Sequence, residues 1–139
     1  VIFMNDSKAT NIGALAAALA GCQQPVVLIA GGRDKGSDYT ELQDVVRNKV
    51  RSLVLIGEAA DLMNEALGAF VPVLRADSME EAVLKAKKAA LPGDMVLLSP
   101  GCASFDMFSG YEARGNSFAA AVVGLREKSA VSSLSKGGQ

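Results

Sequence analysis

Short apolar blocks alternate with longer amphipathic stretches along most of the chain. The apolar blocks predict buried β-strands at 1–4, 26–30, 52–56, 71–74 and 95–98. The stretches between and after them predict helices at 12–20, 40–48, 59–67 and 79–90, and a last one from about 111 to 128. Strands that alternate with helices are typical of a parallel sheet with helices on its faces. We therefore predict an α/β fold: a Rossmann-like, mostly parallel sheet of five to six strands with helices on both faces.

Residues that start and stop helices support these boundaries. Gly21 and Gly68 stand where helix C-caps belong. Ser78, followed three residues later by Glu81, forms a capping box at the start of a helix. The turn Leu91-Pro92-Gly93-Asp94 then stops that helix and leads into the next strand. The local signals therefore agree with the apolar pattern.

Composition narrows the class of protein. Half of the 139 residues are apolar, enough for one domain with a sizeable core, but no apolar run is long enough to cross a bilayer. Fourteen basic and fifteen acidic residues leave no basic stripe for nucleic acid. The chain has no histidine, the commonest general base and metal ligand. Two cysteines without metal spacing, and no signal peptide, favour a reducing cytoplasm.

The two ends of the chain differ from its middle. Residues 129–139 are mostly Ser, Gly and Lys, so we predict a domain at 1–128 and a flexible polar tail at 129–139. The first residue is not Met and already belongs to a strand-like run. We therefore expect a domain cut from a longer chain.

Polar loops follow three of the predicted strands, at 5–11, 31–38 and 99–106. The ligand crevice of such sheets lies beyond the carboxyl ends of the strands, so we expect these loops to meet at one rim. The first loop precedes a helix, whose free N–H groups and partial positive charge favour an anionic ligand. Asp6, Lys8 and Thr10 there offer an acceptor, a cation and a hydroxyl. A cap on the helix, by Ser7, Thr10 or Asn11, explains part of this pattern equally well.

The second and third loops each offer one polar group for a ligand. Neither G-x-x-x-x-G-K-[ST] nor G-x-G-x-x-G occurs, so the chain lacks the usual cradles for ATP or NAD. Glycines 31–32 let the backbone approach a ligand while Lys35 supplies a charge, unless Lys35 is merely solvated. Ser104 is a candidate donor to a carboxylate, but no histidine can activate it as a nucleophile. Cys102 is interpreted as a buried packing residue.

The residues around the start of the last helix are assigned structural roles. Phe108 and Tyr111 are expected in the core or in a pocket wall. We expect Arg114 to pair with Glu112 or Asp106 and so to fix the third loop.

Three segments together resemble the C-terminal domain of the Mur ligases that add D-glutamate, the UDP-N-acetylmuramoyl-L-alanine:D-glutamate ligases. They are Asn-Asp-Ser-Lys-Ala-Thr-Asn at 5–11, Gly-Gly-x-x-Lys-x-x-Asp-Tyr at 31–39, and a longer segment at 93–118 that contains Ser-Pro-Gly-Cys-Ala-Ser-Phe-Asp and Tyr-Glu-x-Arg-Gly-Asn. The resemblance covers residues 1 to about 126. Its first and last segments distinguish these ligases from the sister enzymes that add other amino acids.

The resemblance implies an ATP-dependent amide synthesis in bacterial peptidoglycan formation, on which cell shape and division depend. ATP would phosphorylate the carboxylate of UDP-MurNAc-L-alanine, and the amine of D-glutamate would attack the acyl phosphate. In the family, ATP and Mg are bound mainly by a central domain and the UDP sugar by an N-terminal domain, and this matches the missing phosphate loop. The resemblance also implies a cytoplasmic enzyme that is monomeric at full length, and an inactive isolated fragment.

The resemblance assigns residues by motif position. It implies ATP contacts by Asp6 and Lys8. It implies a D-glutamate pocket made by Thr10, Lys35, Ser104, Phe105 and Tyr111. The family often has Leu where Phe105 stands and Phe where Tyr111 stands, which alters the pocket rim. No residue of this chain is assigned to catalysis or to a metal.

Two other functions remain open from the sequence. A free-standing α/β ligand-binding module would bind a small dicarboxylate or a nucleotide on its own. Another ligase of the same superfamily, such as a folylpolyglutamate synthase, is disfavoured by the 6–11 string. A Rossmann dehydrogenase is disfavoured by the missing glycine fingerprint.

Overall fold

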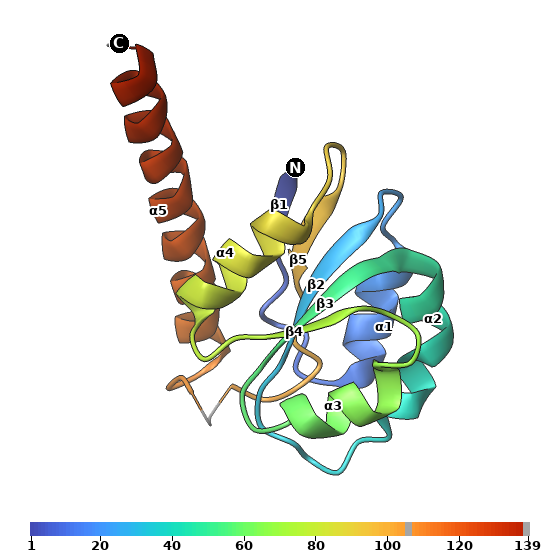
Figure 1. The fold of residues 1–139 in the computed structure, drawn as a ribbon. Coiled ribbons are helices and arrows are strands. Elements are labelled where there is room, and N and C mark those ends of the chain that lie inside the picture. Colours follow the sequence, from blue (N-terminus) through green and yellow to red (C-terminus); the bar gives the residue numbers. More distant parts are fainter. Residues whose placement is uncertain (105–106, 138–139) are drawn as a thin grey trace.

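The computed structural model describes residues 1–104 and 107–137, with side chains up to Arg126 (Figure 1). Its elements, in chain order, are β1 (Ile2–Asn5), α1 (Ile12–Ala20), β2 (Val26–Gly31), the 3₁₀ helix η1 (Tyr39–Leu42), α2 (Gln43–Lys49), β3 (Val50–Ile56), α3 (Ala60–Leu67), β4 (Val73–Arg75), α4 (Met79–Ala89), β5 (Met95–Leu98) and α5 (Tyr111–Gly137). The strands form one five-stranded parallel sheet in the order β1-β5-β2-β3-β4. The predicted α/β fold is confirmed.

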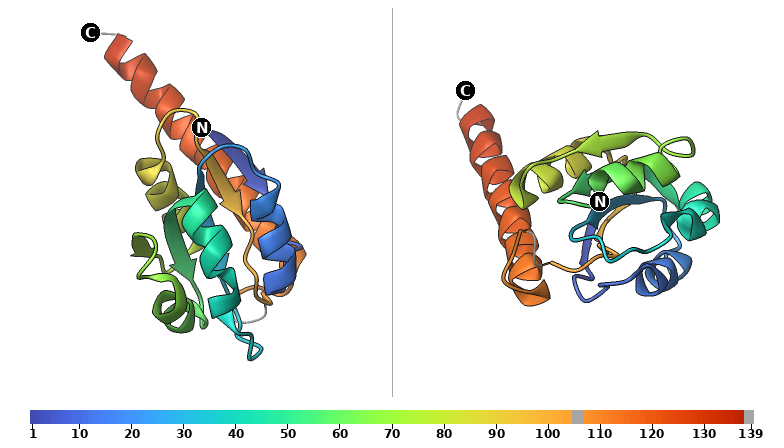
Figure 2. Two further views of the ribbon diagram at one scale, coloured as in Figure 1. Left: turned by 90° about the vertical axis from the view of Figure 1, so that its right-hand side faces the viewer. Right: turned by 90° about the horizontal axis from the view of Figure 1, so that it is seen from below.

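Helices cover both faces of the sheet, which divides the core into two layers (Figures 1 and 2). Alternate residues of the central strands point to opposite faces. Leu28 of β2 therefore packs in the cluster that also includes side chains of α1, α2 and α3. Its neighbour Val27 packs in the cluster formed with α4 and α5. Every residue of β2 is buried, as expected for a central strand between two helical layers.

Several boundaries differ from the predicted ones by one or two residues, and two of the differences have a clear physical reason. The predicted helix at 40–48 begins with the 3₁₀ turn η1, which Asp38 caps by accepting the Thr40 N–H at 3.1 Å. The fourth strand begins at Val73, because Pro72 has no N–H to donate to a strand ladder. The carbonyl of Pro72 accepts the Leu53 N–H at 2.9 Å. Neither difference alters the topology.

The last helix extends further than predicted. The sequence indicates an end near Lys128, but α5 continues to Gly137 and projects beyond the sheet (Figure 1). Residues 125–136 contain neither glycine nor proline, so no residue there interrupts a helix. The division into a domain at 1–128 and a flexible tail at 129–139 stays a prediction. Within the described residues, none of the helices has the length and apolar content needed to cross a membrane.

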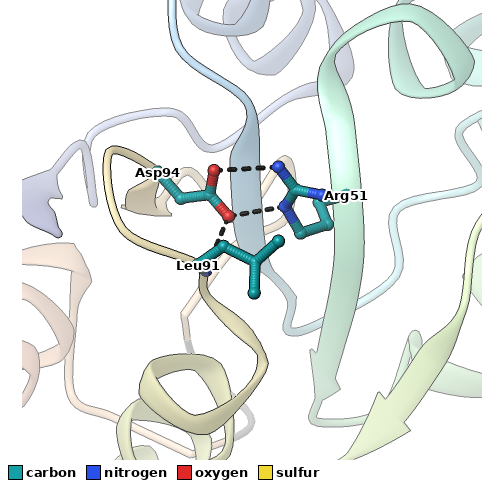
Figure 3. Close-up of polar contacts among 3 residues, drawn as sticks. All are labelled: Arg51, Leu91 and Asp94. Carbon is teal, nitrogen blue, oxygen red and sulfur yellow. Dashed lines mark hydrogen bonds and ion pairs between the residues drawn. The ribbon is translucent and has the colours of Figure 1, made fainter.

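An ion pair joins two strands near their amino ends (Figure 3). Asp94 precedes β5, and its side chain is 2% exposed. Its carboxylate accepts the Arg51 Nε–H at 2.5 Å, the Nη2–H at 3.1 Å and the Leu91 N–H at 2.9 Å. The hydrogen bonds from Arg51 hold the pKa of Asp94 below its ordinary value, although burial acts in the opposite direction. This pair connects the start of β3 to the turn that leads into β5.

Candidate functional site

The three polar loops meet because of the strand order. We call them the first loop (6–11), the second loop (32–38) and the third loop (99–110); they follow β1, β2 and β5. Since β5 lies between β1 and β2, the third loop lies between the other two. Gly101 N–H donates to the Ala9 carbonyl at 2.8 Å, and Arg33 N–H to the Ala103 carbonyl at 2.8 Å. Backbone hydrogen bonds therefore join the third loop to both of its neighbours.

Glycines allow the second strand and its loop to pack tightly against other backbone. Gly31 and Gly32 have φ values of +119° and +139°. A Cβ on Gly32 would lie 2.3 Å from the Ala103 carbonyl oxygen, and one on Gly31 would lie 2.0 Å from that of Ile56. The sequence reasoning assigned these glycines to a close approach by a ligand. In the structure, the atoms that approach them belong to the protein.

A pocket of about 460 Å³ opens where the loops meet, with walls from all three loops and the first turn of α5. Four of the five residues predicted to bind D-glutamate line it: Thr10, Lys35, Ser104 and Tyr111. The fifth, Phe105, lies outside the described residues. The structure therefore brings together residues that are widely separated in the sequence. What they bind stays a prediction.

Three of these side chains have polar groups that make no hydrogen bond or ion pair to the described part of the chain. Ser104 is 2% exposed, and its hydroxyl makes no hydrogen bond to any described residue. The hydroxyl of Thr10 and the ammonium of Lys35 likewise have no partner in the described part of the chain. The helix cap offered as the alternative explanation is Asn11, whose Oδ1 accepts the Ala14 N–H at 2.8 Å. A cap therefore does not explain Thr10.

A buried tyrosine fixes the turn that carries Lys35. Tyr39 Oη–H donates to Asp34 Oδ1 at 2.7 Å, and the same oxygen accepts the Gly36 N–H at 3.1 Å. Burial is the main cause that raises the pKa of Tyr39, and hydrogen bonds to Cys102 and Asp34 raise it further, so the phenol stays protonated. Sequence reasoning missed this contact, although Tyr39 closes the second motif. Cys102 itself is 2% exposed, consistent with its predicted packing role.

Arg114 connects the first loop, the third loop and α5. The residue is 1% exposed. Its Nη2–H donates to the Ser7 carbonyl at 2.9 Å, its Nε–H to Ser7 Oγ at 3.1 Å, and its Nη1–H to the Cys102 carbonyl at 2.9 Å. The predicted pairing of Arg114 with Glu112 or Asp106 stays a prediction, although the described contacts of Glu112 include no pair with Arg114. The other predicted partner, Asp106, lies outside the described residues.

The first turn of α5 is fixed against the first loop. Ser7 Oγ–H donates to the Tyr111 carbonyl at 2.6 Å, and Asn5 Nδ2–H donates to the Gly115 carbonyl at 3.0 Å. A Cβ on Gly115 would lie 3.2 Å from Ser7 Cβ, so this helical glycine permits the close approach. Tyr111 is 41% exposed at the pocket. The pocket wall formed by α5 is therefore held by hydrogen bonds between residues that are far apart in the sequence.

The two residues predicted to contact ATP do not line this pocket. Asp6 is half-buried, and its Oδ2 accepts the Ser99 Oγ–H at 3.1 Å. Lys8 is exposed on the same loop. Among the residues that the structure describes, no three His, Cys, Asp or Glu side chains gather to hold a metal ion.

Fold and site together define an α/β domain with a polar pocket at the carboxyl edge of its parallel sheet. Residues 1–102 match the family described as the Mur ligase glutamate ligase domain, and the chain belongs to that family.

Two curated relatives illustrate the similarity. Over 119 residues, the chain is 53% identical to the UDP-N-acetylmuramoylalanine–D-glutamate ligase of Salinibacter ruber, covering 85% of this chain and 26% of the relative. Over 127 residues, it is 54% identical to the enzyme of that name from Legionella pneumophila strain Lens, covering 88% and 28%. The chain thus spans about a quarter of the length of these relatives. A solved ligase domain from Haemophilus ducreyi covers 86% of both chains at 19% identity, with a TM-score of 0.44.

Proposed function

We propose that this chain is the part of a D-glutamate-adding Mur ligase that holds D-glutamate during amide formation. The observation that carries the proposal is the convergence of Thr10, Lys35 and Ser104 from three separate loops on one pocket. Relatives at 53% and 54% identity that are named as D-glutamate ligases support it. The pocket has the volume range of small-molecule sites.

The polar groups suit the charge of the proposed substrate. D-glutamate has two carboxylates, and the pocket offers one ammonium, from Lys35, and the hydroxyl donors of Thr10 and Ser104. A hydrogen bond to a charged group contributes about 1.5–3 kcal/mol. The domain would therefore act by positioning the amino acid and neutralising its charge. Tyr111 would close one side of the pocket.

The full reaction needs groups that we assign to other parts of the ligase. ATP would convert the carboxylate of UDP-MurNAc-L-alanine into an acyl phosphate, which makes phosphate the leaving group. The D-glutamate amine would then attack that carbonyl carbon, and the tetrahedral intermediate would expel phosphate. On this chain, Asp6 and Lys8 would reach the ribose and phosphate side of ATP. The isolated chain would catalyse no ATP turnover.

A chimera tests the proposal with this chain in place. This chain would replace the matching segment of the Salinibacter ruber relative, and phosphate release would be measured with ATP, UDP-MurNAc-L-alanine and D-glutamate. We expect release that requires all three. Activity that does not depend on D-glutamate, or an inactive but folded chimera, would contradict the proposal.

A lysine variant tests the pocket itself. Lys35→Ala in the chimera should raise the KM for D-glutamate by about 10- to 100-fold, because one charge-assisted hydrogen bond is lost. The KM for ATP should hardly change. Lys87→Ala, which removes an exposed lysine on α4, is the matched control. Unchanged dependence on D-glutamate in Lys35→Ala would remove Lys35 from the pocket.

Direct titration separates the proposal from a free-standing binding module. Calorimetry of the isolated chain with D-glutamate should give weak or no binding, because the other parts of a ligase complete each site. Tight binding of a dicarboxylate or a nucleotide by the isolated chain would favour the free-standing module.

A further inference from the structure

One acidic residue lines the same pocket as Lys35. Among the described residues of the pocket wall, Glu112 is the only carboxylate and Lys35 the only ammonium. Sequence reasoning gave Glu112 a structural role as a partner of Arg114. No described contact joins Glu112 to Arg114, which donates hydrogen bonds to Ser7 and Cys102. The position of Glu112 in the pocket therefore needs another explanation.

The backbone around Glu112 is held in place, whereas its carboxylate is exposed. On one side the Tyr111 carbonyl accepts the Ser7 Oγ–H at 2.6 Å, and on the other the buried Arg114 contacts two loops. The Glu112 side chain makes no hydrogen bond or ion pair to any residue that the structure describes. An exposed carboxylate that lacks a described partner, carried on a fixed backbone in a pocket wall, is available to bind a cationic group.

The charges of the proposed substrate supply that cationic group. D-glutamate carries two carboxylates and one ammonium at neutral pH. Lys35, Thr10 and Ser104 match the carboxylates, which leaves the ammonium without a counterpart among them. We infer that Glu112 binds the α-ammonium of D-glutamate and is a specificity-determining residue of the site. The inference rests on the proposed function.

A third attachment point also gives the pocket a means to distinguish D- from L-glutamate. Two carboxylate subsites alone can hold either enantiomer, because they specify only the ends of the molecule. A fixed acceptor for the amine selects the enantiomer whose ammonium points toward α5. Since Glu112 is exposed, an amine bound there stays accessible to a second substrate. The amine that must attack is thus oriented without being enclosed.

The test uses Glu112→Gln in the chimera, with glutarate as the probe. Glutarate has the two carboxylates of glutamate but no ammonium. We expect the KM for D-glutamate to rise about 10- to 100-fold, as for the loss of one charge-assisted hydrogen bond. We expect the inhibition constant of glutarate to stay unchanged or to fall. Lys35→Ala should weaken both ligands, and Glu65→Gln, an exposed change on α3, should weaken neither.

The other outcomes are distinguishable. If Glu112 only complements the positive end of α5, the variant would lower the melting temperature and leave the KM unchanged. If D-glutamate and glutarate weakened together, the pocket as a whole would be disturbed. Either result overturns the inference and leaves the proposed function intact. A wild-type chimera without D-glutamate-dependent activity would overturn both.

Discussion

The contact between the second and third loops can be tested at Gly32. In Gly32→Ala, the new Cβ would lie 2.3 Å from the Ala103 carbonyl oxygen, far inside van der Waals contact. The loops would have to separate, which stretches the 2.8 Å hydrogen bond from Arg33 N–H to that same oxygen. The substitution also places alanine at a φ of +139°, a conformation that favours glycine.

The magnitude follows from these two effects. Overpacking costs about 1–3 kcal/mol and a lost hydrogen bond about 1 kcal/mol. Gly36→Ala is a matched control in the same loop, because its φ is +82° but no other atom lies within 4 Å of the place that its Cβ would take. The strain of a positive φ is therefore common to both variants. The difference between them, about 2–4 kcal/mol, isolates the contact between the loops.

Urea unfolding of this chain, followed by circular dichroism, measures both variants against the wild type. We expect Gly32→Ala to have a clearly lower midpoint than Gly36→Ala at a similar m-value. In the chimera, Gly32→Ala should also raise the KM for D-glutamate, since Lys35 and Ser104 lie on the two separated loops. Equal destabilisation by the two variants would show that the loops do not depend on this close approach, and would refute the reasoning.

Two further predictions concern the ion pair and the buried tyrosine. The pKa of Asp94 is lowered from 3.8 in the folded state, so the ionised carboxylate stabilises the fold above that pH, and this stabilisation is lost as the pH falls through the folded pKa. The urea midpoint of the wild type should therefore drop below about pH 4, and that of Asp94→Asn should drop less steeply. Parallel curves for the two proteins would contradict this. Tyr39→Phe removes the hydroxyl that donates to Asp34, so the turn that carries Lys35 should loosen. The KM for D-glutamate in the chimera should then rise severalfold, with little change in melting temperature. An unchanged KM would show that the turn holds without the hydroxyl.

The local structure could be predicted because its causes are local. The apolar run of β2 and the capping of α4 each depend on residues within a few positions, and Ser78 Oγ does accept the Glu81 N–H at 3.1 Å. The end of α5 lies further along the chain than the predicted end near Lys128, because nothing in residues 125–136 stops a helix. The predicted polar tail at 129–139 stays a prediction.

The sequence predicted that three polar loops meet at one rim, but not which strands lie next to one another. Placing polar residues after parallel strands indicates which edge of the sheet they occupy, and the motifs of the family resemblance selected Thr10, Lys35 and Ser104. Their meeting in one pocket depends on β5 lying between β1 and β2, an order that no local pattern encodes. The position of Glu112 in the pocket was not foreseen for the same reason.

The sequence by itself determined the strands, most helix boundaries and the candidate polar groups, because each follows from spacing and propensity over a few residues. Only the tertiary structure decided the partners of those groups. Ser7 and Arg114 are 107 positions apart, and their contact exists because α5 packs against the first loop. Such pairings result from the packing of whole elements around the sheet, so they become visible only when the chain is folded.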